Sequence, residues 1–143
     1  MKKLIHLLLI FILVITAFPI NAQSFYGSNG QNIGKIDSDG TLRNSNGASI
    51  GKITKDGIIR NSNGAQIGKI DSDGTIRDRN NSSIGKVDSD GTVRDKYNAS
   101  IGRIDKDGTV RNANGAQIGR VGSINPKFAA VIFFMNLFWR YKI

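Results

Sequence analysis

Residues 33–49 read IGKIDSDGTLRNSNGAS, and the next 17 residues repeat the pattern as IGKITKDGIIRNSNGAQ. Five such units begin at Ile33, Ile50, Ile67, Ile84 and Ile101. A sixth begins at Ile118 and stops at Gly122, while residues 24–32 align with the second half of a unit. A fixed period of this strength predicts a repeat architecture.

Each unit holds two short aliphatic stretches, such as IGKI and TLR, separated by DSDG and NSNG. Short apolar runs bounded by Asp-Gly and Asn-Gly are typical of β-hairpins. Three-residue loops with a left-handed glycine at the third position place Asp37 opposite Thr41 and Ile36 opposite Leu42. Asn replaces this glycine at two loops, and Asn is the other residue that tolerates the conformation. These positions are Asn81 and Asn98.

The same rule at the next turn places Asn44 opposite Ala48 and Leu42 opposite Ile50, so the aliphatic side chains form one row on one face. Ile33 and Ile36 are three residues apart, which puts them on opposite faces of a regular strand. A β-bulge at Gly34–Lys35 would turn both inward. The alternative is that one isoleucine faces outward.

Counting strands predicts how the repeat ends. The five units supply ten strands, and the fragments around Phe25 and 118–121 supply two more. Pairing of these two fragments would complete a sixth unit and close the sheet into a shallow barrel without edges. We therefore predict an all-β closed repeat barrel over residues 23–124; an open solenoid is the alternative.

The C-terminal segment 125–143 is predicted to fill this ring. Asn125 and Pro126 are typical of a helix start, and residues 128–139 are apolar nearly all round, as expected of a segment buried in protein or lipid. Twelve helical residues reach about 18 Å, which is too short for a bilayer. Helix or strand is possible here, and in both cases we expect a plug inside the ring. The basic tail 140–143 has no assigned role.

Residues 1–22 have the pattern of a secretory signal peptide: Lys2 and Lys3, an apolar run to Ala17, and a small residue at Ala22. An uncleaved membrane anchor is the alternative. Cleavage after Ala22 would leave a mature chain from Gln23 without Cys, His or Glu. We expect an exported bacterial protein, periplasmic, at the outer surface or secreted.

This inventory argues against catalysis and against a cofactor. General acid–base chemistry near neutral pH relies mainly on His, Glu, Asp or a tuned Lys, and here the remaining polar residues mostly recur in every unit, whereas an active site is singular. We expect no catalytic residue and no cofactor. The loop Asp37–Gly40 resembles the start of a calcium loop, but position twelve is Ala48 rather than Glu, and Thr54 replaces the first Asp in the second unit. A hairpin turn explains it without a metal.

Cations recur at two positions of every unit and, in the predicted register, lie opposite each other on the outer face. Together they form the Lys/Arg belt: Lys35, Arg43, Lys52, Arg60, Lys69, Arg77, Lys86, Arg94, Arg103 and Arg111. Opposed like charges are mildly destabilising, so the belt is a candidate site for anionic lipid or another polyanion. The alternative is a solvated face partly neutralised by the turn aspartates. Nucleic acid is disfavoured because aromatic residues do not alternate with the cations.

The recurrent IGKIDSDGTIRN pattern, the Asn-Gly turns, the signal peptide and the Phe-rich C-terminus resemble the five-fold β-flower proteins of bacterial secretomes. The resemblance covers residue 23 to about 139, and the Asp-Gly hairpins would be the petals. Their glycines are Gly40, Gly57, Gly74, Gly91 and Gly108. The resemblance implies a shallow barrel with an apolar interior, similar in outline to Tubby-like domains, and carries over no catalytic residue.

Two function classes remain from the sequence. One is a non-enzymatic binding module for anionic lipid or glycan at an envelope surface. The other is a structural or adhesive repeat protein without a small ligand, whose partner is another envelope protein. A carrier of hydrophobic ligands is a third hypothesis, and it requires the C-terminal segment to leave the ring.

Overall fold

The computed structural model describes residues 22–138, so the predicted signal peptide, apart from Ala22, and the tail 139–143 lie outside the described residues. Within residues 22–138, twelve strands precede one helix. They are β1 (Gln23–Gly27), β2 (Asn32–Ile36), β3 (Thr41–Asn44), β4 (Ser49–Ile53), β5 (Ile58–Asn61), β6 (Gln66–Ile70), β7 (Thr75–Asp78), β8 (Ser83–Val87), β9 (Thr92–Asp95), β10 (Ser100–Ile104), β11 (Thr109–Asn112), β12 (Gln117–Val121) and α2 (Pro126–Phe133).

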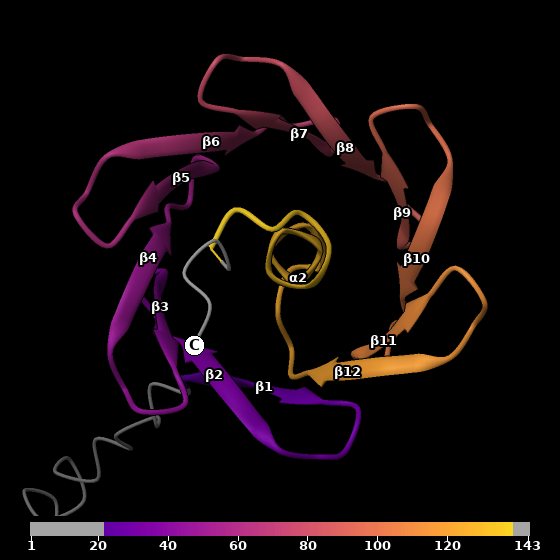
Figure 1. Cartoon of the computed structure of the whole chain (residues 1–143), viewed down its shortest axis with the longest axis horizontal. Helices are drawn as coiled ribbons and strands as arrows, with labels where there is room; N and C mark the ends of the chain where they lie inside the picture. The colour runs from indigo at the N-terminus through magenta and orange to yellow at the C-terminus, as the bar shows by residue number, and fades with distance from the viewer. Residues whose placement is uncertain (1–21, 139–143) are drawn as a thin grey trace, which may run out of the picture.

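The strands form a closed antiparallel barrel, as predicted, with each strand paired to its sequence neighbours (Figure 1). The ring closes between β1 and β12, where Phe25 lies opposite Val121 and Tyr26 opposite Arg120. The open-solenoid alternative is therefore wrong. Closure leaves no unpaired strand edge, which removes the usual template for edge-to-edge aggregation.

Both kinds of turn have the predicted three-residue loop. The amide of Asp37 donates to Thr41 O at 2.8 Å, and that of Asn44 donates to Ala48 O at 3.0 Å. Gly40 has φ 86°, and the loop positions occupied by Asn81 and Asn98 have φ 66° and 68°. The Asp-Gly turns share one rim of the barrel, so the expectation that they form the petals is wrong. The loops that project outward as petals in Figure 1 instead join β1 to β2, β3 to β4 and so on around the ring.

The Asp-Gly turns are packed against the next unit, and the projecting loops are not. Ile53 N donates to Gly40 O at 2.9 Å, and the same bond joins each later Asp-Gly glycine to the following unit. A side chain at Gly40 would collide with Ile53 O, whereas nothing lies within 4 Å of the same position at Gly47. This difference explains why Asn replaces glycine only in the projecting loops.

The register between units differs from the prediction by one residue. Ile36 lies opposite Leu42 as expected, but Leu42 lies opposite Gly51, not Ile50, and the pairing jumps to Arg43 opposite Ser49. The predicted bulge therefore exists, but the extra residue is the isoleucine before the glycine, Ile50 here and Ile33 in the first unit. As a result Ile33 is only half-buried at the margin of the core, while Ile36 is buried.

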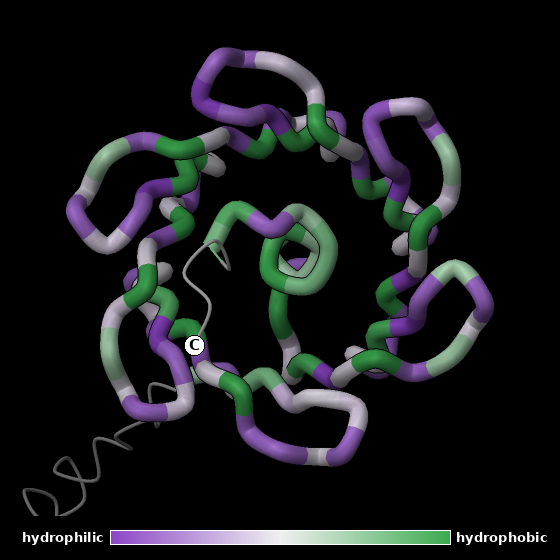
Figure 2. The backbone as a smooth tube through the Cα atoms, viewed as in Figure 1, coloured by the Kyte–Doolittle hydropathy of each residue, from purple (hydrophilic) through white to green (hydrophobic). Residues whose placement is uncertain are grey.

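The interior is apolar and is filled by the C-terminal segment (Figure 2). The inward row of the sheet is Phe25, Ile36, Leu42, Ile53, Ile59, Ile70, Ile76, Val87, Val93, Ile104, Val110 and Val121. Helix α2 stands inside the ring, with residues 129–132 buried. The Asn125 side chain accepts from Lys127 N at 3.0 Å, which caps the helix as predicted, and Pro126 opens the first turn.

Of the two alternatives for the apolar segment, helix or strand, the structure has a helix, α2, which ends at Phe133. The following residues run along the inside of the ring (Figure 1). Each large side chain of this stretch covers the buried glycine of one IGK or IGR motif, and Asn136, with φ 50°, is exposed and covers none. The pairs are Phe133 with Gly119, Phe134 with Gly102, Met135 with Gly85, Leu137 with Gly68 and Phe138 with Gly51.

We call these five glycines and Gly34 the glycine sockets. Gly34 receives Phe25 of β1, whose Cδ2 would lie 3.4 Å from an added Cβ. Successive large side chains of the plug thus contact the units in the reverse of their chain order, with one side chain to each unit. The sockets give glycine a packing role inside the strands, because an added Cβ at each of them would collide with a carbonyl oxygen of the neighbouring strand. At Gly51, Gly85, Gly102 and Gly119 it would also collide with the covering side chain of the plug.

Candidate functional site: the outer charged face

The belt cations lie opposite each other, as the sequence predicted. Each Lys or Arg of an even-numbered strand from β2 to β10 faces the Arg of the next strand. The pairs are Lys35–Arg43, Lys52–Arg60, Lys69–Arg77, Lys86–Arg94 and Arg103–Arg111. The barrel thus brings all ten predicted residues into one repeated arrangement.

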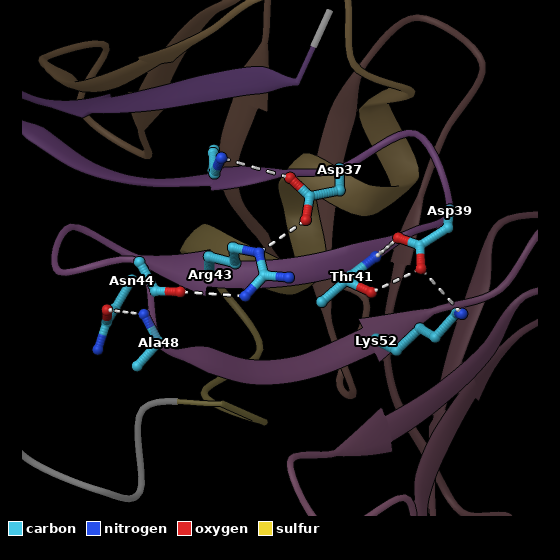
Figure 3. Close-up of polar contacts among 9 residues, drawn as sticks. Asp37, Asp39, Thr41, Arg43, Asn44, Ala48 and Lys52 are labelled. Atoms are coloured by element: carbon cyan, nitrogen blue, oxygen red, sulfur yellow. Dashed lines mark hydrogen bonds and ion pairs between the residues drawn. The ribbon is translucent and has the colours of Figure 1, made fainter. Parts of the chain in front are cut away.

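A carboxylate lies between the cations in most units, where the sequence had indicated only that the turn aspartates partly neutralise the outer face. Asp37 Oδ2 is 2.7 Å from Arg43 Nε, and its Oδ1 is 3.6 Å from Lys35 Nζ (Figure 3). Asp71 and Asp105 bridge their cation pairs in the same way, and Asp88 contacts Arg94 at 2.6 Å. This carboxylate offsets the repulsion between opposed cations.

The arginines also bind the projecting loops. Arg43 Nη1 donates to Gly47 O at 3.1 Å, and the equivalent bonds are made by Arg60, Arg77, Arg94 and Arg111. One guanidinium therefore connects an Asp-Gly turn with the projecting loop of the same strand. The arginines have a structural role whatever else they contact.

The second aspartate of each Asp-Gly turn stabilises that turn. Asp39 accepts from Thr41 N at 2.9 Å and from the Thr41 hydroxyl at 3.0 Å, and Lys52 Nζ lies 3.4 Å away (Figure 3). The Thr41 amide, followed by these other contacts, lowers the pKa of Asp39 to about 2. The two carboxylates of the calcium-like loop thus bind protein groups, and no cluster of potential metal ligands is found within residues 22–138.

The second unit departs from this pattern because Thr54 stands where the others have the bridging Asp. The Thr54 hydroxyl bonds to Asp56, and it accepts from Ile58 N at 3.0 Å. Lys52 and Arg60 are opposed as elsewhere, but no carboxylate of the described residues forms an ion pair with Arg60. Among the five opposed cation pairs, this is the one in which a non-acidic residue occupies the position of the bridging aspartate.

The bridging aspartates had a detectable signal in the sequence. Asp37 is two residues after Lys35, so both side chains leave the same face of the sheet. Asp37 is also six residues before Arg43, and a three-residue loop brings these positions diagonally together. Combining charge spacing with the predicted register would have identified the Lys–Asp–Arg triplet.

Fold and surface together define a class: a closed ring of β-hairpin repeats, plugged by its own C-terminal segment and charged on the outside. The model of the 5-fold beta-flower protein family matches residues 22–137, and the chain belongs to this family. The family consists of repeat barrels and is not known as an enzyme family. Neither a curated protein nor a solved structure matches the chain.

Proposed function

We propose that this protein is an exported, non-catalytic binding module that contacts an anionic partner, lipid headgroups or acidic glycan, through the outside of a rigid ring. The observation that carries the proposal is the belt itself: ten cations on the outer face of a barrel whose interior is already filled. A rigid scaffold adds little ordering cost when such a surface binds.

The charge of the ring supports this proposal and also limits it. Residues 22–138 contain sixteen Lys and Arg and eleven Asp, a net charge of +5. Most belt cations have a carboxylate of the chain beside them, so their attraction for a partner is partly compensated. Among residues 22–138, the belt cations without such an ion pair are Arg60 and Lys86.

The non-catalytic part of the proposal rests on residue chemistry. Residues 22–143 contain no His, Cys or Glu. The acidic groups that remain recur from unit to unit and are engaged with turn amides or arginines. Such repeated, engaged carboxylates are suited to holding a fold together rather than to proton transfer at one reacting centre.

A structural or adhesive scaffold is the second candidate, and the in-chain ion pairs of Asp37, Asp71, Asp88 and Asp105 favour it. The third hypothesis, a hydrophobic-ligand carrier, requires the plug to leave the glycine sockets. Phe138 is only 6% exposed, so its release would expose substantial apolar surface. Among residues 22–138, no helix has the length and hydrophobicity needed to cross a bilayer.

Co-sedimentation tests the proposal. The protein is mixed with vesicles of phosphatidylcholine, with or without phosphatidylglycerol, or with polygalacturonate beads, at roughly 0.02 M and 0.5 M salt. We expect binding only to the anionic surfaces and only at low salt. Changing Lys35, Lys52, Lys69 and Lys86 to Gln should abolish it.

The matched control changes four cations outside the belt, Arg79, Lys96, Lys106 and Lys127, to Gln, and so removes the same charge. Equal loss in both variants would attribute binding to net charge rather than to the belt. Absence of binding to every surface would favour the scaffold. Retention by the belt variant alone would show that another surface makes the contact.

A further inference from the structure

We propose that the Lys52–Arg60 pair is a binding site for a carboxylate supplied from outside the chain, of the kind that uronic acids carry on an acidic glycan. The inference rests on the proposed function, because it takes the belt as the surface that contacts the partner. It then places the specific binding site in the second unit of that belt. Its basis is a comparison of the second unit with its own repeats.

The repeats show what this pair of cations binds. In four units the arginine Nε lies 2.6–2.8 Å from an aspartate Oδ2. In three of them the other oxygen of the same carboxylate lies 3.3–3.6 Å from the facing cation. One carboxylate therefore bridges the two cations, with one oxygen toward each.

The second unit keeps the cationic half of this arrangement. Lys52 faces Arg60 in the same register as Lys35 faces Arg43. Arg60 Nη1 donates to Gly64 O at 3.0 Å, matching the 3.1 Å bond from Arg43 to Gly47. Because the same loop bond orients both guanidinium groups, Arg60 presents its Nε–H toward the place where the other units have their carboxylate.

Thr54 does not replace that carboxylate. Its hydroxyl is engaged within the turn by Asp56 and by the Ile58 amide. The Thr54 hydroxyl is the largest cause of the lowered pKa of Asp56, and the charges of Arg60 and Lys69 lower it further without an ion-pair contact. Within residues 22–138, the ion pair that Lys52 makes is with Asp39 of the preceding turn, at 3.4 Å.

Local charge and exposure allow an external group to bind. Lys52 has 41% of its side chain exposed, and the neighbouring turn adds Lys55 where the first unit has Ser38. Because the site is half-exposed, the expected affinity for a single carboxylate is weak, on the order of millimolar. A polymer with repeated carboxylates would bind more tightly through several contacts.

Arginine side-chain NMR of the whole protein tests the site directly. The Nε–Hε signals are followed during titration with sodium acetate and with glucuronate, and with sodium chloride and inorganic phosphate for comparison. We expect saturable shifts of Arg60 with the two carboxylates. Arg43, Arg77 and Arg94 should shift far less, because each already has an aspartate at Nε.

Two substitutions each give one unit the residue that another unit has at the equivalent position. Thr54→Asp gives the second unit the residue of its neighbours and should weaken carboxylate binding at Arg60 at least about tenfold. Asp71→Thr gives the third unit the residue of the second and should create a carboxylate response at Arg77. Both variants use residues that this fold already accommodates at the equivalent position.

The proposal is overturned if Arg60 and Arg77 respond alike in the unmodified protein, or if chloride at equal ionic strength shifts Arg60 as much as acetate does. A stronger response to phosphate than to carboxylates would also overturn it and would point to lipid headgroups. The two proposals fail separately. Salt-sensitive binding to polygalacturonate that survives Thr54→Asp leaves the belt function intact and eliminates this site.

Discussion

Phe134 packs so closely on Gly102 that an added Cβ at the glycine would lie 2.5 Å from the ring atom Cζ. The same relation holds between Met135 and Gly85, where the distance to Cε is 2.6 Å. The plug and the ring are therefore fitted to each other residue by residue. The units of the ring are nearly identical in sequence, whereas the plug that packs against them is not a repeat.

Gly102→Ala is expected to destabilise the protein by about 3 kcal/mol, because the new methyl group collides with both Phe134 and the Arg111 carbonyl oxygen. The measurement is the midpoint of urea unfolding. Gly122→Ala is the control, since nothing lies within 4 Å of an added Cβ at Gly122, and it should change stability by less than about 0.5 kcal/mol. Similar midpoints for the two variants would contradict the socket packing.

A chain ending at Ile124 is expected to lose cooperative thermal unfolding, because it lacks α2 and the side chains that cover five of the six glycine sockets. Calorimetry measures this directly. Phe138→Ala is a milder version and should cost about 3 kcal/mol, the typical effect of removing a buried phenylalanine. A truncated chain that melts cooperatively at a similar temperature would show that the ring is stable without its plug.

Two glycine positions that look alike in sequence should respond differently to asparagine. Gly64→Asn should change the unfolding free energy by less than about 0.5 kcal/mol, since Asn81 and Asn98 already occupy equivalent positions with positive φ. Gly57→Asn should cost more than about 2 kcal/mol, because its side chain would collide with Ile70 O. Paired chemical denaturation curves give both values. Equal changes in unfolding free energy would mean that the positive φ of the turn, and not the contact with the next unit, determines which residues these positions accept.

Much of the fold followed from the sequence because the determining interactions are local. The three-residue loops, the left-handed glycines and the Asn125 cap depend on neighbouring residues. Ring closure also followed, because residues 24–32 and 118–122 are complementary parts of one unit. These features needed only the period and the chemistry of the turns.

The parts that could not be predicted depend on contacts between distant residues. The bulge at Ile50 rather than at the following glycine depends on which residue faces Leu42 across the sheet. The end of α2 at Phe133 is set by the sockets, which the next side chains must reach. In the candidate site, the belt register was predicted, whereas the bridging role of Asp37 required register and charge to be considered together.

Acid is expected to destabilise the fold through the turn carboxylates. The pKa of Asp39 is lowered from 3.8 to about 2, first by the Thr41 amide. That of Asp71 is also lowered, first by its hydrogen bond with Arg77. Four further turn aspartates have lowered pKa values: Asp56, Asp73, Asp90 and Asp107.

The direction of the effect follows from linkage. A carboxyl group with a lower pKa in the folded state binds fewer protons there than in the unfolded chain, so stability rises with pH across the interval between the two values. The contribution of Asp39 is thus fully present above 3.8 and is lost as the pH falls toward about 2. Urea midpoints should therefore be level above about pH 5 and fall steadily below about pH 4. Asp39→Asn should lower the midpoint at neutral pH and flatten this acid dependence, and a midpoint unchanged between neutral pH and pH 2 would show that the turn carboxylates do not stabilise the ring.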